Sequence, residues 1–216
     1  MPPTRANCSA PTPARRPSNA PAPRGKPMSE LAELKARVDR LESRAAITEL
    51  ASHYASACDE HDMPRLIALF TPDACFDSPS GTMVAHGRAA IEALFIELFK
   101  IRGPAFHWTH DVIVRVDPHN PERASGRVYS HAETTPGEVV SLAAMRYDDE
   151  YQRDGGVWRI HKRVISFLYY VPFTQYATAL NQPERLHIRG EIRRADYPES
   201  LPAWQQFAAQ YCKPAG

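Results

Sequence analysis

The chain has 216 residues, of which 43% are hydrophobic and 24% are charged, and its formal net charge at pH 7 is +1. This composition is typical of a globular domain and excludes a fibrous or wholly disordered chain. No stretch approaches the roughly 20 apolar residues that a membrane helix needs, and the N-terminus lacks the apolar core of a secretory signal. We therefore expect a cytoplasmic protein without a membrane partner.

The first 27 residues hold eight of the twenty prolines and five basic residues, but no acidic residue. Such a segment cannot bury enough apolar surface to offset its ordering entropy, so we predict a disordered tail over residues 1–28. The rest of the chain is left slightly acidic, which argues against a nucleic-acid partner. The four cysteines show no C-x-x-C spacing, so we expect reduced thiols rather than a zinc site or a disulfide scaffold.

Helical periodicity begins at Ser29, because apolar residues recur at steps of three and four from Leu31 to Tyr54. This pattern predicts one long helix or two abutting helices over roughly 29–58. Asp62 then stands two residues before Pro64, which is typical of a helix N-cap followed by proline in the first turn. A third helix is predicted from Gly87 to about residue 103.

The remaining elements of the body are predicted to be strands. Two short candidates, 74–77 and 82–86, flank a Ser-Pro-Ser-Gly turn. Four longer candidates follow, at 106–116, 124–134, 140–152 and 157–170. Helices followed by a four-strand meander indicate an α+β domain over 29–172, with a curved antiparallel sheet wrapped around the N-terminal helices. Residues 173–216 are punctuated by proline, and we expect this C-terminal extension to pack on the body or on a neighbouring subunit.

Several motifs are spread over residues 40–170: the run from Leu41 to Ile47, the run from Leu69 to Ala74, Ser125-Gly126-Arg127, and the segment from Tyr147 to Trp158. In these motifs the chain resembles the SnoaL-like, scytalone dehydratase-like branch of the nuclear transport factor 2 (NTF2-like) superfamily. That group also includes hexachlorocyclohexane dehydrochlorinase and the bile-acid 7α-dehydratases. The resemblance implies a cone-shaped α+β barrel, open at one end, with a cavity between the first helix and the concave face of the sheet.

In the eliminating members of this family, an aspartate near the end of the first helix contacts a histidine on the sheet. The matching positions here are Asp59 and His107. A histidine can accept and return a proton near neutral pH, and a carboxylate bonded to its second nitrogen fixes the tautomer. Tyr54 is the candidate proton donor, because it shares the buried helix face of Ile47 and Leu50; alternatively, it is simply a core residue.

Three further residues are candidates for the substrate pocket: His110, His131 and Arg146. The spacing His107-x-x-His110 places the two rings on opposite faces of a strand, so we predict no metal site, and His110 reaches the pocket only if a bulge rotates it inward. Arg146, like Arg163, either orients an anionic substrate or lies on a solvated face. The chain has no Gly-rich dinucleotide or phosphate-binding motif, so we expect no cofactor.

The resulting hypothesis is a cofactor-independent lyase, either a dehydratase or a dehydrohalogenase, acting on a small and largely apolar ring-containing substrate. The alternatives are an isomerase or cyclase of steroid or polyketide type, and a ligand-binding module without catalysis. Two departures from the scytalone enzyme, Cys58 in place of a tyrosine and Thr134 in place of a second histidine, argue against that enzyme's substrate. We also expect a homo-oligomer, because apolar residues such as Trp108 and Ile113 alternate onto both faces of the sheet. The resemblance to dehydratases that associate through the outer face of the sheet implies a trimer in preference to a dimer.

Overall fold

The structure is a computed structural model and describes residues 29–212. The predicted tail, residues 1–28, lies outside the described residues. The chain divides into a unit that ends at Asp39 and a unit that begins at Arg40, and helix α1 (Glu30–Asp59) belongs to both. The description below concerns the second unit. None of the helices within 29–212 is long and apolar enough to cross a membrane.

Helix α1 ends at the point where the chain turns sharply toward a second helix. His61 takes the left-handed conformation, with φ of 55°, and the backbone N–H of Asp62 donates to the carbonyl of Ala57. The Asp62 side chain then caps α2 (Met63–Ala68) by accepting a hydrogen bond of 3.1 Å from the backbone N–H of Arg65. The predicted N-cap is therefore confirmed. This turn leaves Asp59 in the last turn of α1.

Two short strands and a helix follow: β1 (Phe70–Asp77), β2 (Ala85–His86) and α3 (Arg88–Lys100). The predicted second strand, 82–86, is present only at its last two residues. Side-chain hydrogen bonds hold the preceding residues in a turn, because the Ser78 hydroxyl lies 3.2 Å from that of Thr82 and accepts from the backbone N–H of Met83.

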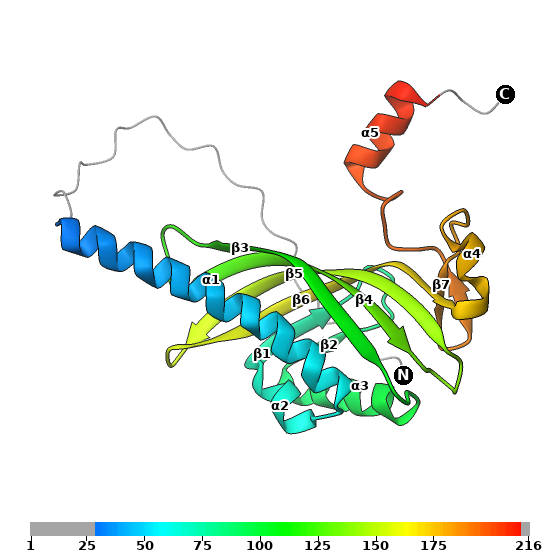
Figure 1. The fold of residues 1–216 in the computed structure, drawn as a ribbon, viewed down its shortest axis with the longest axis horizontal. Coiled ribbons are helices and arrows are strands. Elements are labelled where there is room, and N and C mark those ends of the chain that lie inside the picture. Colours follow the sequence, from blue (N-terminus) through cyan, green and yellow to red (C-terminus); the bar gives the residue numbers. More distant parts are fainter. Residues whose placement is uncertain (1–28, 213–216) are drawn as a thin grey trace, which may run out of the picture. The chain divides into compact units, whose positions relative to one another are not determined.

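The four long strands form the predicted meander, with the order β6-β5-β4-β3 at one side of the sheet (Figure 1). Their bounds are β3 (Phe106–Val116), β4 (Arg123–Thr134), β5 (Ser141–Asp154) and β6 (Val157–Pro172). The sheet is mixed rather than purely antiparallel, because β1 returns from the helices to pair with β6 in the parallel direction. The fold is thus α+β, with a curved sheet that does not close on itself.

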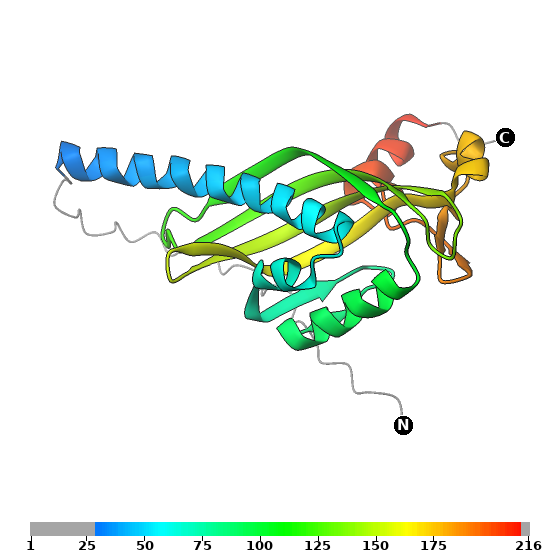
Figure 2. The same cartoon turned by 60° about the horizontal axis from the view of Figure 1, so that its bottom comes forward.

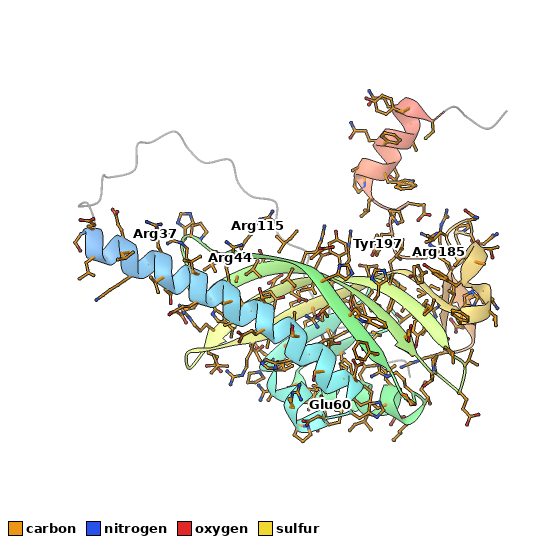
Figure 3. All side chains as sticks on the ribbon, in the orientation of Figure 1. Arg37, Arg44, Glu60, Arg115, Arg185 and Tyr197 are labelled. Carbon is orange, nitrogen blue, oxygen red and sulfur yellow. The ribbon has the colours of Figure 1, made fainter. Side chains whose placement is uncertain are left out.

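Residues after β6 continue the same sheet and then wrap beside it. Leu186 pairs with Tyr170, which adds a small hairpin to β6. The buried Arg185 holds the following loop by donating to the carbonyls of Leu168 and Tyr197, and Figure 3 shows Arg185 and Tyr197 in this segment. The elements of this region are η1 (Phe173–Gln175), α4 (Tyr176–Ala179), β7 (Leu186–Ile188), β8 (Glu191–Arg193) and α5 (Pro202–Tyr211).

A β-bulge interrupts β3 between His110 and Ile113, where Asp111 has a φ of 50°. The bulge inserts a residue and reverses the alternation of side chains beyond it. Trp108 and Ile113 are consequently both exposed, at 47% and 45%. The prediction that these two residues face opposite sides of the sheet is wrong for this reason.

The core lies between the inner face of the sheet and the helices, and Figure 2 shows α2, α3 and β1 together on one side of the long strands. As the helical spacing predicts, Ile47, Leu50 and Tyr54 of α1 are buried, whereas Leu41 is exposed. Gly126 of β4 allows a close approach in this core. A Cβ atom at Gly126 would lie 2.9 Å from the ring of Tyr151, so a larger residue would displace that ring.

Candidate active site

Asp59 and His107 meet where the last turn of α1 faces the start of β3. One carboxylate oxygen, Oδ2, accepts a hydrogen bond of 2.8 Å from the backbone N–H of His107, and the other, Oδ1, lies 2.5 Å from the ring atom Nδ1. The side chains of His107 and Asp59 are only 9% and 15% exposed. An ionised carboxylate only accepts hydrogen bonds, so it favours the tautomer with the proton on Nδ1. This tautomer leaves a free lone pair on Nε2 of His107.

The imidazole of His107 lines a cavity of about 110 Å³ that also borders Tyr54. A dry cavity of about 150 Å³ binds benzene in another protein, so this volume is on the scale of a single six-membered ring. Most of the wall is apolar. Its aliphatic and aromatic members include Met83, Phe95, Leu98, Ala132, Met145, Ile165 and Phe167.

Tyr54 belongs to a buried polar cluster beside the cavity. The guanidinium carbon of Arg163 lies 4.1 Å from the centre of the Tyr54 ring and 4.2 Å from that of Tyr147. Arg163 donates to both oxygens of Asp149, at 2.9 and 2.7 Å, and the Tyr151 hydroxyl donates to the same carboxylate at 2.7 Å. Burial raises the pKa of Tyr54, so its hydroxyl keeps its proton at neutral pH.

The sequence suggested that Arg163 either orients an anionic substrate or lies on a solvated face, and the structure supports neither position. It is 1% exposed, so it does not lie on a solvated face, and it is not among the residues that line the cavity. The carboxylate of Asp149 makes this burial possible, because a buried charge needs a partner that also accepts its hydrogen bonds.

The structure does not bring His110, His131 and Arg146 to this cavity. The bulge of β3 follows His110 and leaves its ring on the face opposite to that of His107. There, Nε2 of His110 lies 2.9 Å from Nδ1 of His131. Arg146 lies on the same face, stacked 4.5 Å from the centre of the Tyr197 ring. Because neighbouring residues of a strand point to opposite faces, this arrangement follows from the register of β3, β4 and β5.

Several residues that the sequence did not assign to a pocket line the cavity. The hydroxyl groups of Thr134 and Tyr170 lie 2.7 Å apart, and Arg102 donates from Nη2 to the carbonyl of Cys58 at 2.9 Å. A register shift between β5 and β6 after Ala144 allows Tyr170 to face the cavity together with Phe167. No local sequence signal marks such a shift.

Within residues 29–212, no group of three or more His, Cys, Asp or Glu side chains is arranged to hold a metal ion. Cys58 and Cys212 are free cysteines, and the sulfur atom of Cys75 lies 3.5 Å from Nδ1 of His86.

The curved sheet, the N-terminal helices and the cavity between them define an NTF2-like α+β fold. More narrowly, the chain belongs to the SnoaL-like domain family, whose model matches residues 39–164.

The chain is similar to several known proteins of this fold. The gamma-hexachlorocyclohexane dehydrochlorinase of Sphingobium indicum is 26% identical over 135 residues, which are 62% of this chain and 86% of that protein. The crystal structure of LinA matches with a TM-score of 0.56 and 26% identity, over 63% of this chain and 93% of the other. A scytalone dehydratase-like protein from Novosphingobium aromaticivorans matches with a TM-score of 0.59 over 74% of this chain and 95% of the other. Its 17% identity establishes the fold alone.

Proposed function

We propose that this protein is a cofactor-independent lyase that eliminates water or a halide from a small, largely apolar ring-containing substrate. The observation that carries the proposal is the contact between Asp59 and His107 at the wall of an apolar cavity. A pocket that only binds a ligand has no need for a carboxylate that orients an imidazole. Similarity to a dehydrochlorinase supports the same class of reaction.

In the proposed reaction, Nε2 of His107 accepts a proton from a carbon next to the carbon that bears the leaving group. The electron pair of the broken C–H bond forms the new C=C bond, and the leaving group departs with the electrons of its own bond. Asp59 stabilises the imidazolium cation that forms. The Tyr54 hydroxyl, protonated because burial raises its pKa, donates a hydrogen bond to the departing hydroxide or halide.

The cavity restricts the substrate by size and polarity. Its volume of about 110 Å³ suits a single ring, and its walls supply mostly aliphatic and aromatic contacts. A bulkier polycyclic substrate would need to extend through the open end of the cavity.

The test uses compounds with an acidic C–H bond beside a leaving group. Chloride release is measured with gamma-hexachlorocyclohexane, and loss of water is measured with cyclic β-hydroxy ketones. Incorporation of deuterium from D₂O is followed for each compound by mass spectrometry. We expect the wild-type protein and the variant His53→Ala, which changes an exposed histidine of the same helix as Asp59, to react alike. The variant His107→Ala should lose the reaction.

The three hypotheses give different results. Deuterium exchange without release of a leaving group would instead favour an isomerase, which begins with the same proton abstraction. If neither exchange nor elimination occurs with any compound that binds, the protein is a ligand-binding module. Full activity in His107→Ala would exclude the proposed mechanism.

A further inference from the structure

The cavity beside His107 is lined by two arginines, Arg102 and Arg189, and by two histidines, His107 and His187. No Asp or Glu is among its lining residues in the described part of the chain. A low-dielectric pocket that carries only basic groups attracts anions and disfavours cations. The lining therefore bears on the charge of the substrate as well as on its size.

Arg102 is the basic group whose position is best defined. Its backbone forms a β-bridge with Pro136, its guanidinium carbon lies 4.7 Å from the centre of the Phe99 ring, and Nη2 donates to the Cys58 carbonyl. Its Nε is buried and has no hydrogen-bond partner. None of the ion pairs found within residues 29–212 involves Arg102. The guanidinium thus keeps both a positive charge and a donor that the protein does not use.

The Cys58 thiol, which lines the same cavity, does not supply the missing negative charge. Burial raises the pKa of Cys58 to about 11, so the thiol is neutral at physiological pH. Burial likewise raises the pKa of Tyr170, and its phenol remains protonated. A partly buried guanidinium without a counter-ion is costly, and an anionic ligand would remove that cost.

The hydroxyl groups of Thr134 and Tyr170 provide a second donor. They lie 2.7 Å apart, so one of their two protons forms the hydrogen bond between them. The other proton remains available to a ligand oxygen, because each hydroxyl group carries a single hydrogen. Both residues line the cavity.

The strand pairings bring these donors to one end of the cavity. Thr134 ends β4 two residues before Pro136, which is bridged to Arg102. Tyr170 pairs with Leu186, so the hairpin of β7 and β8 begins beside it and carries His187 and Arg189 to the same end. The hairpin lies beyond the part of the chain that matches the family model, which ends at residue 164.

We infer that this end of the cavity binds a carboxylate group, and that the substrate is a monocyclic ring acid rather than a neutral compound. Arg102 forms the charged hydrogen bond to the carboxylate, and the Thr134–Tyr170 pair donates to its second oxygen. Arg189 adds a second positive charge to the lining. This inference rests on the proposed function for the fate of the substrate, but the binding of the acid does not depend on catalysis.

The test compares two ring compounds of nearly equal size by isothermal titration calorimetry at pH 7.5. Cyclohexanecarboxylate carries the negative charge, and cyclohexanecarboxamide is its neutral counterpart. For the wild-type protein we expect the acid to bind at least 10-fold more tightly than the amide. We expect Arg102→Met to abolish this preference. Arg115→Met is the matched control, because Arg115 of β3 lines a separate groove (Figure 3) and its replacement should leave the preference intact.

The double variant Thr134→Val/Tyr170→Phe nearly keeps the shape of both side chains and removes both hydroxyl groups, so it tests the second donor. We expect it to weaken binding of the acid several-fold and to leave binding of the amide unchanged. Arg102→Lys keeps the positive charge and should retain part of the preference for the acid. This variant keeps the inference testable if Arg102→Met does not fold. Circular dichroism verifies the fold of each variant.

Three results would overturn the inference: equal affinity for acid and amide, a preference that survives in Arg102→Met, or no binding of the acid at millimolar concentrations. The two proposals fail separately. A wild-type protein that prefers the acid but turns over no compound of the panel would reject the lyase proposal and leave the carboxylate site standing. If the wild-type protein turns over neutral compounds and shows no preference for the acid, the carboxylate site is rejected and the lyase proposal remains.

Discussion

Replacing Asp59 with asparagine exchanges one carboxylate oxygen for an amide nitrogen and keeps the size of the side chain. In the wild-type protein, one oxygen accepts the backbone N–H of His107 and the other accepts the ring Nδ1–H. The amide oxygen of asparagine can serve only one of these donors. If it accepts the backbone N–H, the amide NH₂ faces Nδ1. The imidazole then shifts its proton to Nε2 and loses the lone pair that would accept the substrate proton.

The size of the effect follows from these two contacts. General base catalysis by an oriented histidine contributes about 10²–10⁴ in rate, so we expect Asp59→Asn to lower turnover by roughly that factor. Hydrogen bonds to a charged group contribute about 1.5–3 kcal/mol to stability. We therefore expect Asp59→Asn to decrease the free energy of unfolding by an amount in this range. His107→Ala should cost a similar factor in turnover. The double variant should be little worse than either single variant, because the two residues act as one unit.

The assay is the rate of deuterium exchange or elimination with the best compound of the panel, together with ¹⁵N NMR of the His107 ring. We expect the NMR signal to show the Nδ1–H tautomer in the wild-type protein and the Nε2–H tautomer in Asp59→Asn. An asparagine variant that retains more than about one third of wild-type turnover would refute this reasoning. So would single-variant losses that multiply in the double variant, because independent residues behave in that way.

Four further results are expected. Tyr54→Phe removes one hydrogen bond to the leaving group and should raise the barrier by about 1–3 kcal/mol in steady-state kinetics; an unchanged rate would return Tyr54 to a purely structural role. Asp149→Asn leaves the buried charge of Arg163 without its counter-ion and should lower the free energy of unfolding in urea by about 3–5 kcal/mol, and a loss below 1 kcal/mol would contradict this. The hydrogen bonds from Arg185 lower the pKa of Glu199, so the stability they add is present above its ordinary value of 4.5 and is lost as the pH falls below it. The difference in Tm between wild type and Glu199→Gln should therefore shrink on acidification, and a constant difference would count against it. Light scattering should give a multiple of the chain mass of 24.2 kDa, because apolar side chains are exposed on the outer face of the sheet, and the family resemblance favours three times that mass over twice; the mass of a single chain would exclude the proposed oligomer.

Local patterns in the sequence predict much of this fold. The spacing of apolar residues defines the four long strands to within about two residues, and Asp62 marks the start of α2 because an N-cap involves only neighbouring residues. The pairing of β1 with β6 depends instead on residues far apart in the chain, and no local pattern specifies its parallel direction. No local sequence pattern predicts the bulge after His110 either, although the bulge determines which side chains of β3 face outward.

The candidate site divides in the same way. The family resemblance indicates Asp59 and His107, and the structure places them in contact. The sequence gives no comparable indication of Arg102 or Tyr170, because Arg102 lies on a connecting segment and Tyr170 faces the cavity only through a register shift. Arg163 shows a third limit. A charged residue on a strand predicts exposure, and only the distant Asp149 makes its burial possible.

The hairpin of β7 and β8 is attached to the sheet by one pair of residues, Tyr170 and Leu186, near the end of β6. In the sequence, the hairpin follows Asp59, His107 and all the strands that support this pair. Its loop can therefore change in length or sequence without altering the register of β3 or the end of α1. A change in this hairpin would therefore alter the cavity lining at His187 and Arg189 and leave the contact between Asp59 and His107 in place.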